Sequence, residues 1–136
     1  MTALSTTRTT SRSSSDSLLR LAMRVDAVLS GLCGITLALM AGPSSSLTGY
    51  PASVMYALGG GFVGYAVAVF AGAGLARVRT AGIATMVANL LFTVAAVITV
   101  LDVELTTAGV VATLAVGVYT LVFADLQYLG ARRIKE

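Results

Sequence analysis

The chain of 136 residues has the length of one modest domain, but its composition is not that of a soluble protein. Hydrophobic residues make up 57% of the chain and charged residues only 11%, whereas soluble domains carry roughly 25% charged residues. Because so few polar groups cannot cover a surface in water, the composition predicts an integral membrane protein. The absence of histidine and the single cysteine exclude histidine-ligated haem, histidine-based triads and an intrachain disulfide.

The N-terminal segment, residues 1–17, differs in composition from the rest of the chain. It contains eleven Ser or Thr and almost no apolar side chains. Such a segment buries too little surface to offset the entropy lost on ordering. We therefore expect a disordered cytoplasmic tail, followed by one transmembrane domain over residues 18–133.

The first two membrane spans are predicted from a long stretch without charge. No charged residue occurs from Ala27 to Ala76, a run of fifty. Since a bilayer core of ~30 Å needs about 20 helical residues, this run holds two crossings with a short connection. Two clusters of turn-forming residues mark the connection, GPSSS at residues 42–46 and TGYP at residues 48–51.

Charged residues also delimit the later spans. Arg77 and Arg79 follow the second span, and no charge lies between Arg79 and Asp102. The segments lack the alternating pattern of membrane strands, which need only 9–11 residues. The predicted fold is therefore all-α, a four-helix up-down-up-down bundle with spans over residues 25–41, 52–75, 81–101 and 105–129.

The basic residues predict the orientation. Four crossings place both termini and the loop between the second and third spans on one side of the membrane. All nine basic residues lie on that side, whereas the loop between the third and fourth spans carries Asp102 and Glu104. By the positive-inside rule, both termini are expected on the cytoplasmic side of the membrane.

The basic side chains near the span ends are expected to attract anionic lipid head groups at roughly 1 kcal/mol each, or to form ion pairs. This role explains the net positive charge without a nucleic-acid partner. The residues concerned are Arg20, Arg24, Arg77, Arg79, Arg132 and Arg133.

Small residues follow one face of the second span at a spacing of four. In lipid, helices associate through close packing of small residues, so this ridge either packs within the bundle or forms an interface with another chain. The sequence leaves both alternatives open. Shorter small-residue faces on the first and fourth spans are expected to pack within the bundle. The ridge consists of Gly60, Gly64, Ala68 and Gly72.

Polar side chains within the spans are few. Asn89 lies in the middle of the third span, with Thr85 and Thr93 on the same face. We expect Asn89 to form an interhelical hydrogen bond, and the alternative is a polar lining for a substrate or a water-filled cleft. Tyr65 and Tyr119 also lie deep in their spans, where each hydroxyl needs a hydroxyl or carbonyl partner.

Two carboxylates lie near the cytoplasmic ends of their spans. Asp125 stands where the helix dipole disfavours negative charge, so we expect an ion-pair cluster with nearby arginines. Asp26, at a similar depth, is expected to be a favourable helix-start charge that also pairs with arginine. Alternatively, the two carboxylates share a proton and mark a proton pathway.

Several short stretches resemble a family of uncharacterised small four-helix integral membrane proteins of actinobacteria and other bacteria. The resemblance covers residues 18–133 and implies a four-helix fold in the plasma (inner) membrane of a bacterium, without assigning a catalytic residue. The matching stretches are Leu19-Arg20-Leu21-Ala22, Val25-Asp26-Ala27, Ala41-Gly42-Pro43, Thr48-Gly49-Tyr50-Pro51, Ala88-Asn89, Leu105-Thr106-Thr107-Ala108-Gly109 and Leu126-Gln127-Tyr128-Leu129-Gly130.

Two functions remain open at this point. The chain is expected to be an accessory or structural subunit of a larger membrane assembly, and the alternative is an oligomeric small-solute or proton-coupled transporter or channel. We expect that the protein is not an enzyme and that it binds no cofactor or metal, because the sequence contains no nucleophile–base pair and no ligand motif. The expected partners are the lipid bilayer and either further copies of the chain or a larger complex.

Overall fold

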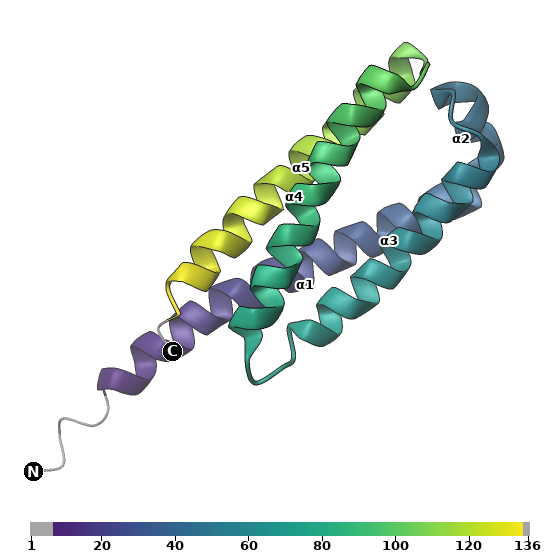
Figure 1. Ribbon diagram of the computed structural model, residues 1–136. Coiled ribbons are helices and arrows are strands. Elements are labelled where there is room, and N and C mark those ends of the chain that lie inside the picture. Colours follow the sequence, from purple (N-terminus) through teal and green to yellow (C-terminus); the bar gives the residue numbers. More distant parts are fainter. Residues whose placement is uncertain (1–6, 135–136) are drawn as a thin grey trace, which may run out of the picture.

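The computed structural model describes residues 7–134, with side chains described from Asp16 onward, and the regular secondary structure of this part of the chain is all α-helix. Four helices are long and apolar enough to span a membrane, namely α1, α3, α4 and α5. The prediction of an all-α chain with four candidate membrane spans is therefore confirmed. The helices are α1 (Thr7–Leu39), α2 (Ala41–Thr48), α3 (Ala52–Gly72), α4 (Val78–Asp102) and α5 (Thr107–Arg132), as Figure 1 shows.

The first helix begins earlier than the composition predicts. It starts at Thr7, so it includes part of the segment 1–17, whose first six residues lie outside the described residues. Propagation of an existing helix adds one hydrogen bond per ordered residue, whereas nucleation is the costly step. The long apolar part of α1 can therefore extend a helix into a segment that would not form one alone.

The connection between the first two spans is a short helix, so the prediction of a turn over residues 42–46 is wrong. Pro43 is the third residue of α2, in the first turn, where backbone N–H groups have no intrahelical acceptor. Its missing N–H therefore costs nothing at this position. The helix ends at Thr48 and is followed by Gly49, whose φ of 86° is a left-handed conformation that glycine adopts readily.

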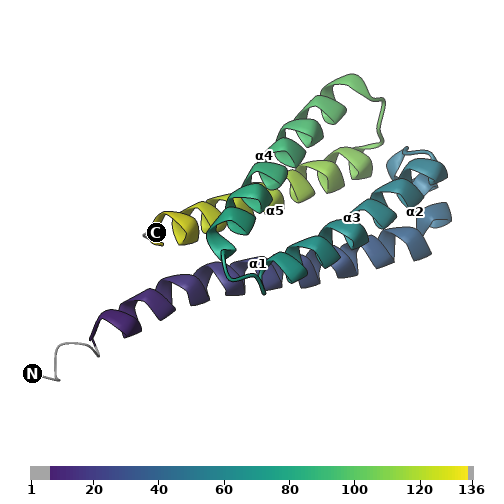
Figure 2. The ribbon, with the colours of Figure 1, turned by 60° about the horizontal axis from the view of Figure 1, so that its bottom comes forward.

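The long helices form two pairs, α1 with α3 and α4 with α5, and Figures 1 and 2 show the members of each pair side by side. Glycines permit the close approach within the first pair. A Cβ atom on Gly34 would lie 2.6 Å from the carbonyl oxygen of Gly59. In the second pair, Gly117 packs against Ala96, to which a Cβ atom would be 3.3 Å distant. The small faces of α1 and α5 thus pack within the chain.

The two pairs join around the N-terminal half of α1. Leu19 and Met23 are fully buried there, in a core that also includes Val78 and Ala131. At the opposite end, the Thr106 hydroxyl donates to the carbonyl oxygen of Leu47 (2.6 Å), which ties α2 to the start of α5. Between these two ends, an apolar groove of about 410 Å³ separates α3 from α4 and α5.

Candidate functional site

Asp26 lies at the centre of a polar cluster inside the bundle. Its side chain has no exposed surface, on the face of α1 that also buries Met23 and Ser30. A carboxylate without hydrogen bonds or a counter-charge is very costly in an apolar environment. Asp26 therefore requires partners from the surrounding helices.

The Asp26 carboxylate accepts five side-chain hydrogen bonds, and the donors come from α1, α3, α4 and α5. Each of the four candidate membrane-spanning helices thus contributes to one acceptor group. The donors to Oδ1 are Ser30 Oγ (3.1 Å) and Tyr119 Oη (3.0 Å), and the donors to Oδ2 are Tyr65 Oη (2.8 Å), Asn89 Nδ2 (3.0 Å) and Gln127 Nε2 (2.9 Å). We call these six residues the Asp26 cluster.

Asp26 forms no ion pair with any side chain in residues 16–134, where the one salt bridge joins Arg20 to Asp16 at 3.8 Å. The expected pairing of Asp26 with arginine is therefore absent from the described part of the chain. The reason is helix geometry, because residues two apart on a helix do not face the same side. Arg24 is exposed, whereas Asp26 points into the bundle.

Asn89 has the interhelical role that its mid-helix position predicts. Besides Asp26, its amide group donates to Gln127 Oε1 at 3.1 Å, so α4 and α5 are linked directly. Thr93 lies next to this link, with its hydroxyl oxygen 2.8 Å from that of Thr120. Thr85 is buried but donates to the Ala81 carbonyl within its own helix. Thr85 is thus not a member of the cluster.

Asp125 is exposed and forms no ion pair within residues 16–134, so the expected ion-pair cluster is not found there. Gln127, two residues further along α5, is fully buried and bonds to Asp26. The sequence contains a signal that Gln127, and not Asp125, points into the bundle. Phe123, Ala124 and Ala131 form the apolar and small face of α5, and the helical period places Gln127 on that face.

Two of the arginines cap helix ends. Arg20 Nη1 donates to the Ala73 carbonyl oxygen at the C-terminus of α3 (2.6 Å), where a positive charge is favoured by the helix dipole. Arg79 Nε donates to the Ala131 carbonyl oxygen near the end of α5 (3.4 Å). The other arginine side chains predicted to meet lipid or ions are exposed, namely Arg24, Arg77, Arg132 and Arg133.

The small-residue ridge on α3 faces mainly outward. A Cβ atom on Gly60 or Gly64 would meet nothing within 4 Å, and Ala68 is exposed. Only the last member, Gly72, is buried, with its Cβ position 3.3 Å from Ala81. The first three residues of the ridge therefore do not pack against another described helix of this chain.

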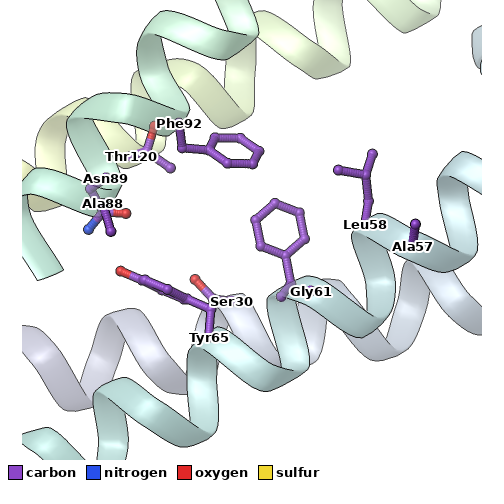
Figure 3. Close-up of a pocket in the computed structure, with 10 residues that line it drawn as sticks. Ser30, Ala57, Leu58, Gly61, Tyr65, Ala88, Asn89, Phe92 and Thr120 are labelled. Carbon is purple, nitrogen blue, oxygen red and sulfur yellow. The ribbon is translucent and has the colours of Figure 1, made fainter.

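A cavity of about 310 Å³ lies beside the Asp26 cluster, between α3 and α4. Figure 3 shows polar side chains at one end of it, from Ser30, Tyr65, Asn89 and Thr120. The remainder is lined by apolar side chains such as Leu58. The cavity thus combines apolar walls with one polar end that adjoins the buried carboxylate.

Asp26 is the one acidic residue of its cluster, which gives it the chemistry of a charged acceptor rather than of a metal centre. Within residues 16–134, no three His, Cys, Asp or Glu side chains gather to hold a metal ion. Comparisons of the chain with models of known families, with curated proteins and with solved structures find no significant match.

Proposed function

We propose that the protein is an accessory or structural subunit of a larger assembly in a bacterial plasma membrane. The observation that carries this proposal is the outward face of α3, where Gly60, Gly64 and Ala68 are exposed and unopposed. Helices in lipid associate where small residues allow their backbones to approach closely. This face therefore suits a membrane helix of another chain.

The Asp26 cluster supports the same function from inside the bundle. In residues 16–134, no fully buried polar side-chain atom lacks a hydrogen-bond partner. A polar cluster whose fully buried atoms are all paired fixes the relative rotation of the helices that contribute to it. A bundle with fixed helix rotations presents the α3 face in one orientation, as a docking subunit requires.

The proposal includes an up-down-up-down arrangement with both termini in the cytoplasm. The distribution of basic residues supports it, since all nine fall on the side of the termini when four spans are drawn. The exposed side chains of Arg24, Arg77 and Arg133 would then face anionic head groups of the inner leaflet.

A second candidate function rests on Asp26 itself. Acidic side chains within a membrane often belong to proton or ion pathways, so an oligomeric small-solute or proton-coupled transporter is the alternative. The adjoining cavity is mainly apolar, and Asn89 bonds to Asp26 and Gln127. These features favour the accessory subunit over a transporter with a hydrated path.

Purification from the native membrane tests the proposal. The tagged full chain is extracted in a mild detergent, and co-purifying proteins are identified and quantified by mass spectrometry. We expect one larger complex at fixed stoichiometry, which Gly64→Leu disrupts because the new side chain fills the outer face of α3. Ala84→Leu, on an exposed position of α4, is the matched control and should retain the complex. Recovery of wild type as a homo-oligomer alone would contradict the proposal and favour the transporter.

A further inference from the structure

We propose that the cavity between α3 and α4 is a binding site for a hydrophobic amine in its protonated, ammonium form. This inference goes beyond the proposed function and does not depend on it. It rests on the shape of the cavity, on the acceptor oxygen atoms at its polar end and on the uncompensated charge of Asp26 behind them.

The cavity has the size and access that a small apolar ligand needs. Its volume of about 310 Å³ lies at the lower end of the range for small-molecule sites, roughly 300–1,000 Å³. Ala57 and Gly61 belong to its wall and are also exposed, so the cavity reaches the outer surface of the bundle. In a membrane this surface meets lipid, from which an apolar ligand can enter.

The polar end of the cavity offers acceptors because its donors are already used. Tyr65 and Ser30 direct their hydroxyl hydrogens to Asp26. Asn89 uses its amide nitrogen for Asp26 and Gln127. A lone pair of the Tyr65 oxygen can still accept a hydrogen bond from a ligand, whereas the Ser30 oxygen already lies 3.4 Å from the Tyr119 hydroxyl oxygen.

The amide oxygen of Asn89 is an unused acceptor. It receives no hydrogen bond from the described residues, although the Asn89 side chain as a whole is only 3% exposed. No fully buried polar atom in this part of the chain lacks a partner, so this oxygen must adjoin open space. Figure 3 shows it on the side of the Asn89 side chain that faces the cavity.

The charge of Asp26 decides which donor this polar end prefers. The carboxylate forms no salt bridge within residues 16–134, and electrostatic attraction is strong where water is excluded. A hydroxyl that donates to a carboxylate also becomes a better acceptor, which applies to Tyr65. An ammonium group benefits from both effects, whereas a neutral donor benefits from the second alone.

Aromatic rings add to the preference for a cation. Phe62 and Phe92 line the cavity with their ring centroids 5.1 Å apart. A cation that has lost its water is attracted by the negative face of an aromatic ring. The same rings and the neighbouring Leu58 provide the apolar contact for the body of the amine.

The side-chain amides provide a direct readout, because Asn89 is the one asparagine and Gln127 the one glutamine of the chain. Their nitrogen-15 NMR signals can therefore be recognised by selective labelling. The full chain in nanodiscs of zwitterionic lipid is titrated with phenylbutylammonium and, separately, with pentylbenzene, which replaces the ammonium by a methyl group. We expect phenylbutylammonium to shift the Asn89 signal saturably, with an affinity about tenfold higher than that of pentylbenzene.

Two neighbouring glycines provide matched variants. Gly61 lines the cavity and Gly60 does not, and a Cβ atom on either would meet nothing within 4 Å. Gly61→Leu should abolish the saturable shift, whereas Gly60→Leu should retain it. In Asp26→Asn, the preference for the ammonium over pentylbenzene should disappear, and the two glycine variants decide the question if this variant does not fold. Equal responses to both compounds in wild type, or a response that Gly61→Leu leaves intact, would overturn the proposal. Either result would indicate that lipid alone fills the cavity.

Discussion

Five neutral hydrogen-bond donors replace water around the Asp26 carboxylate. Hydrogen bonds to charged groups contribute about 1.5–3 kcal/mol each, so the loss of one donor weakens the cluster while four remain. Loss of the carboxylate is more serious, because it leaves several buried donors without their acceptor at once. Removal of the Asp26 carboxylate is therefore expected to destabilise the cluster more than removal of any one of its donors.

Gln127 and Asp125 allow this assignment to be tested on one helix. Gln127→Leu removes a donor to Asp26 and the acceptor of Asn89, so we expect the free energy of unfolding to fall by about 1–3 kcal/mol. Asp125→Asn alters an exposed side chain and should leave stability unchanged. Thermal unfolding in a mild detergent measures both variants. A larger loss for Asp125→Asn than for Gln127→Leu would mean that α5 has a different rotation.

The helix on which each of these residues lies could be predicted from the sequence, but their partners could not. The sequence favours arginine as the partner of both carboxylates, because charge and distance along the chain are visible in a sequence. Helix rotation is less visible where nearly every position is apolar, and it alone decides that Asp26 and Gln127 point inward and Asp125 outward. Tyr65 and Tyr119 were expected to need partners, and the carboxylate that serves both lies on a third helix.

At the scale of the elements, stretches without charge predict the second and third spans closely, whereas the first and fourth candidate spans include the charged residues Asp26 and Asp125. The predicted span over residues 52–75 corresponds to α3 and that over residues 81–101 to α4, with ends that differ by three residues or fewer. The short helix α2 was missed because Gly, Pro and Ser are typical of turns. Pro43 is nevertheless compatible with a helix in its first turn, which the composition of a loop does not reveal.

The contact of α1 with α3 depends on glycine at two positions. In Gly34→Leu, the new Cβ atom would lie 2.6 Å from the Gly59 carbonyl oxygen, so the two helices must separate. We expect a loss of at least about 2 kcal/mol of stability, measured by thermal unfolding in detergent. Gly64→Leu on the outer face of α3 is the control and should fold normally as an isolated chain. Equal stability of the two variants would show that α1 and α3 pack on other faces.

At the scale of the whole molecule, the two helix pairs are joined mainly near one end. The Leu19 and Met23 core and the Asp26 cluster connect them there, and the Thr106–Leu47 hydrogen bond connects them at the other end. The groove and the cavity lie between these connections. The architecture therefore combines a fixed polar centre with two open surfaces, the ridge on α3 and the cavity beside it.

The most direct test of this architecture is the environment of the Asn89 and Gln127 side-chain amides in the full-length protein. If Asp26 gathers donors from four helices, the two amide groups lie in contact across α4 and α5 and away from water. With selective nitrogen-15 labelling in nanodiscs, NMR should then show a nuclear Overhauser effect between the two amide groups and slow exchange of their protons with heavy water. Rapid exchange of both amides without such an effect would contradict the cluster and the helix arrangement built around it.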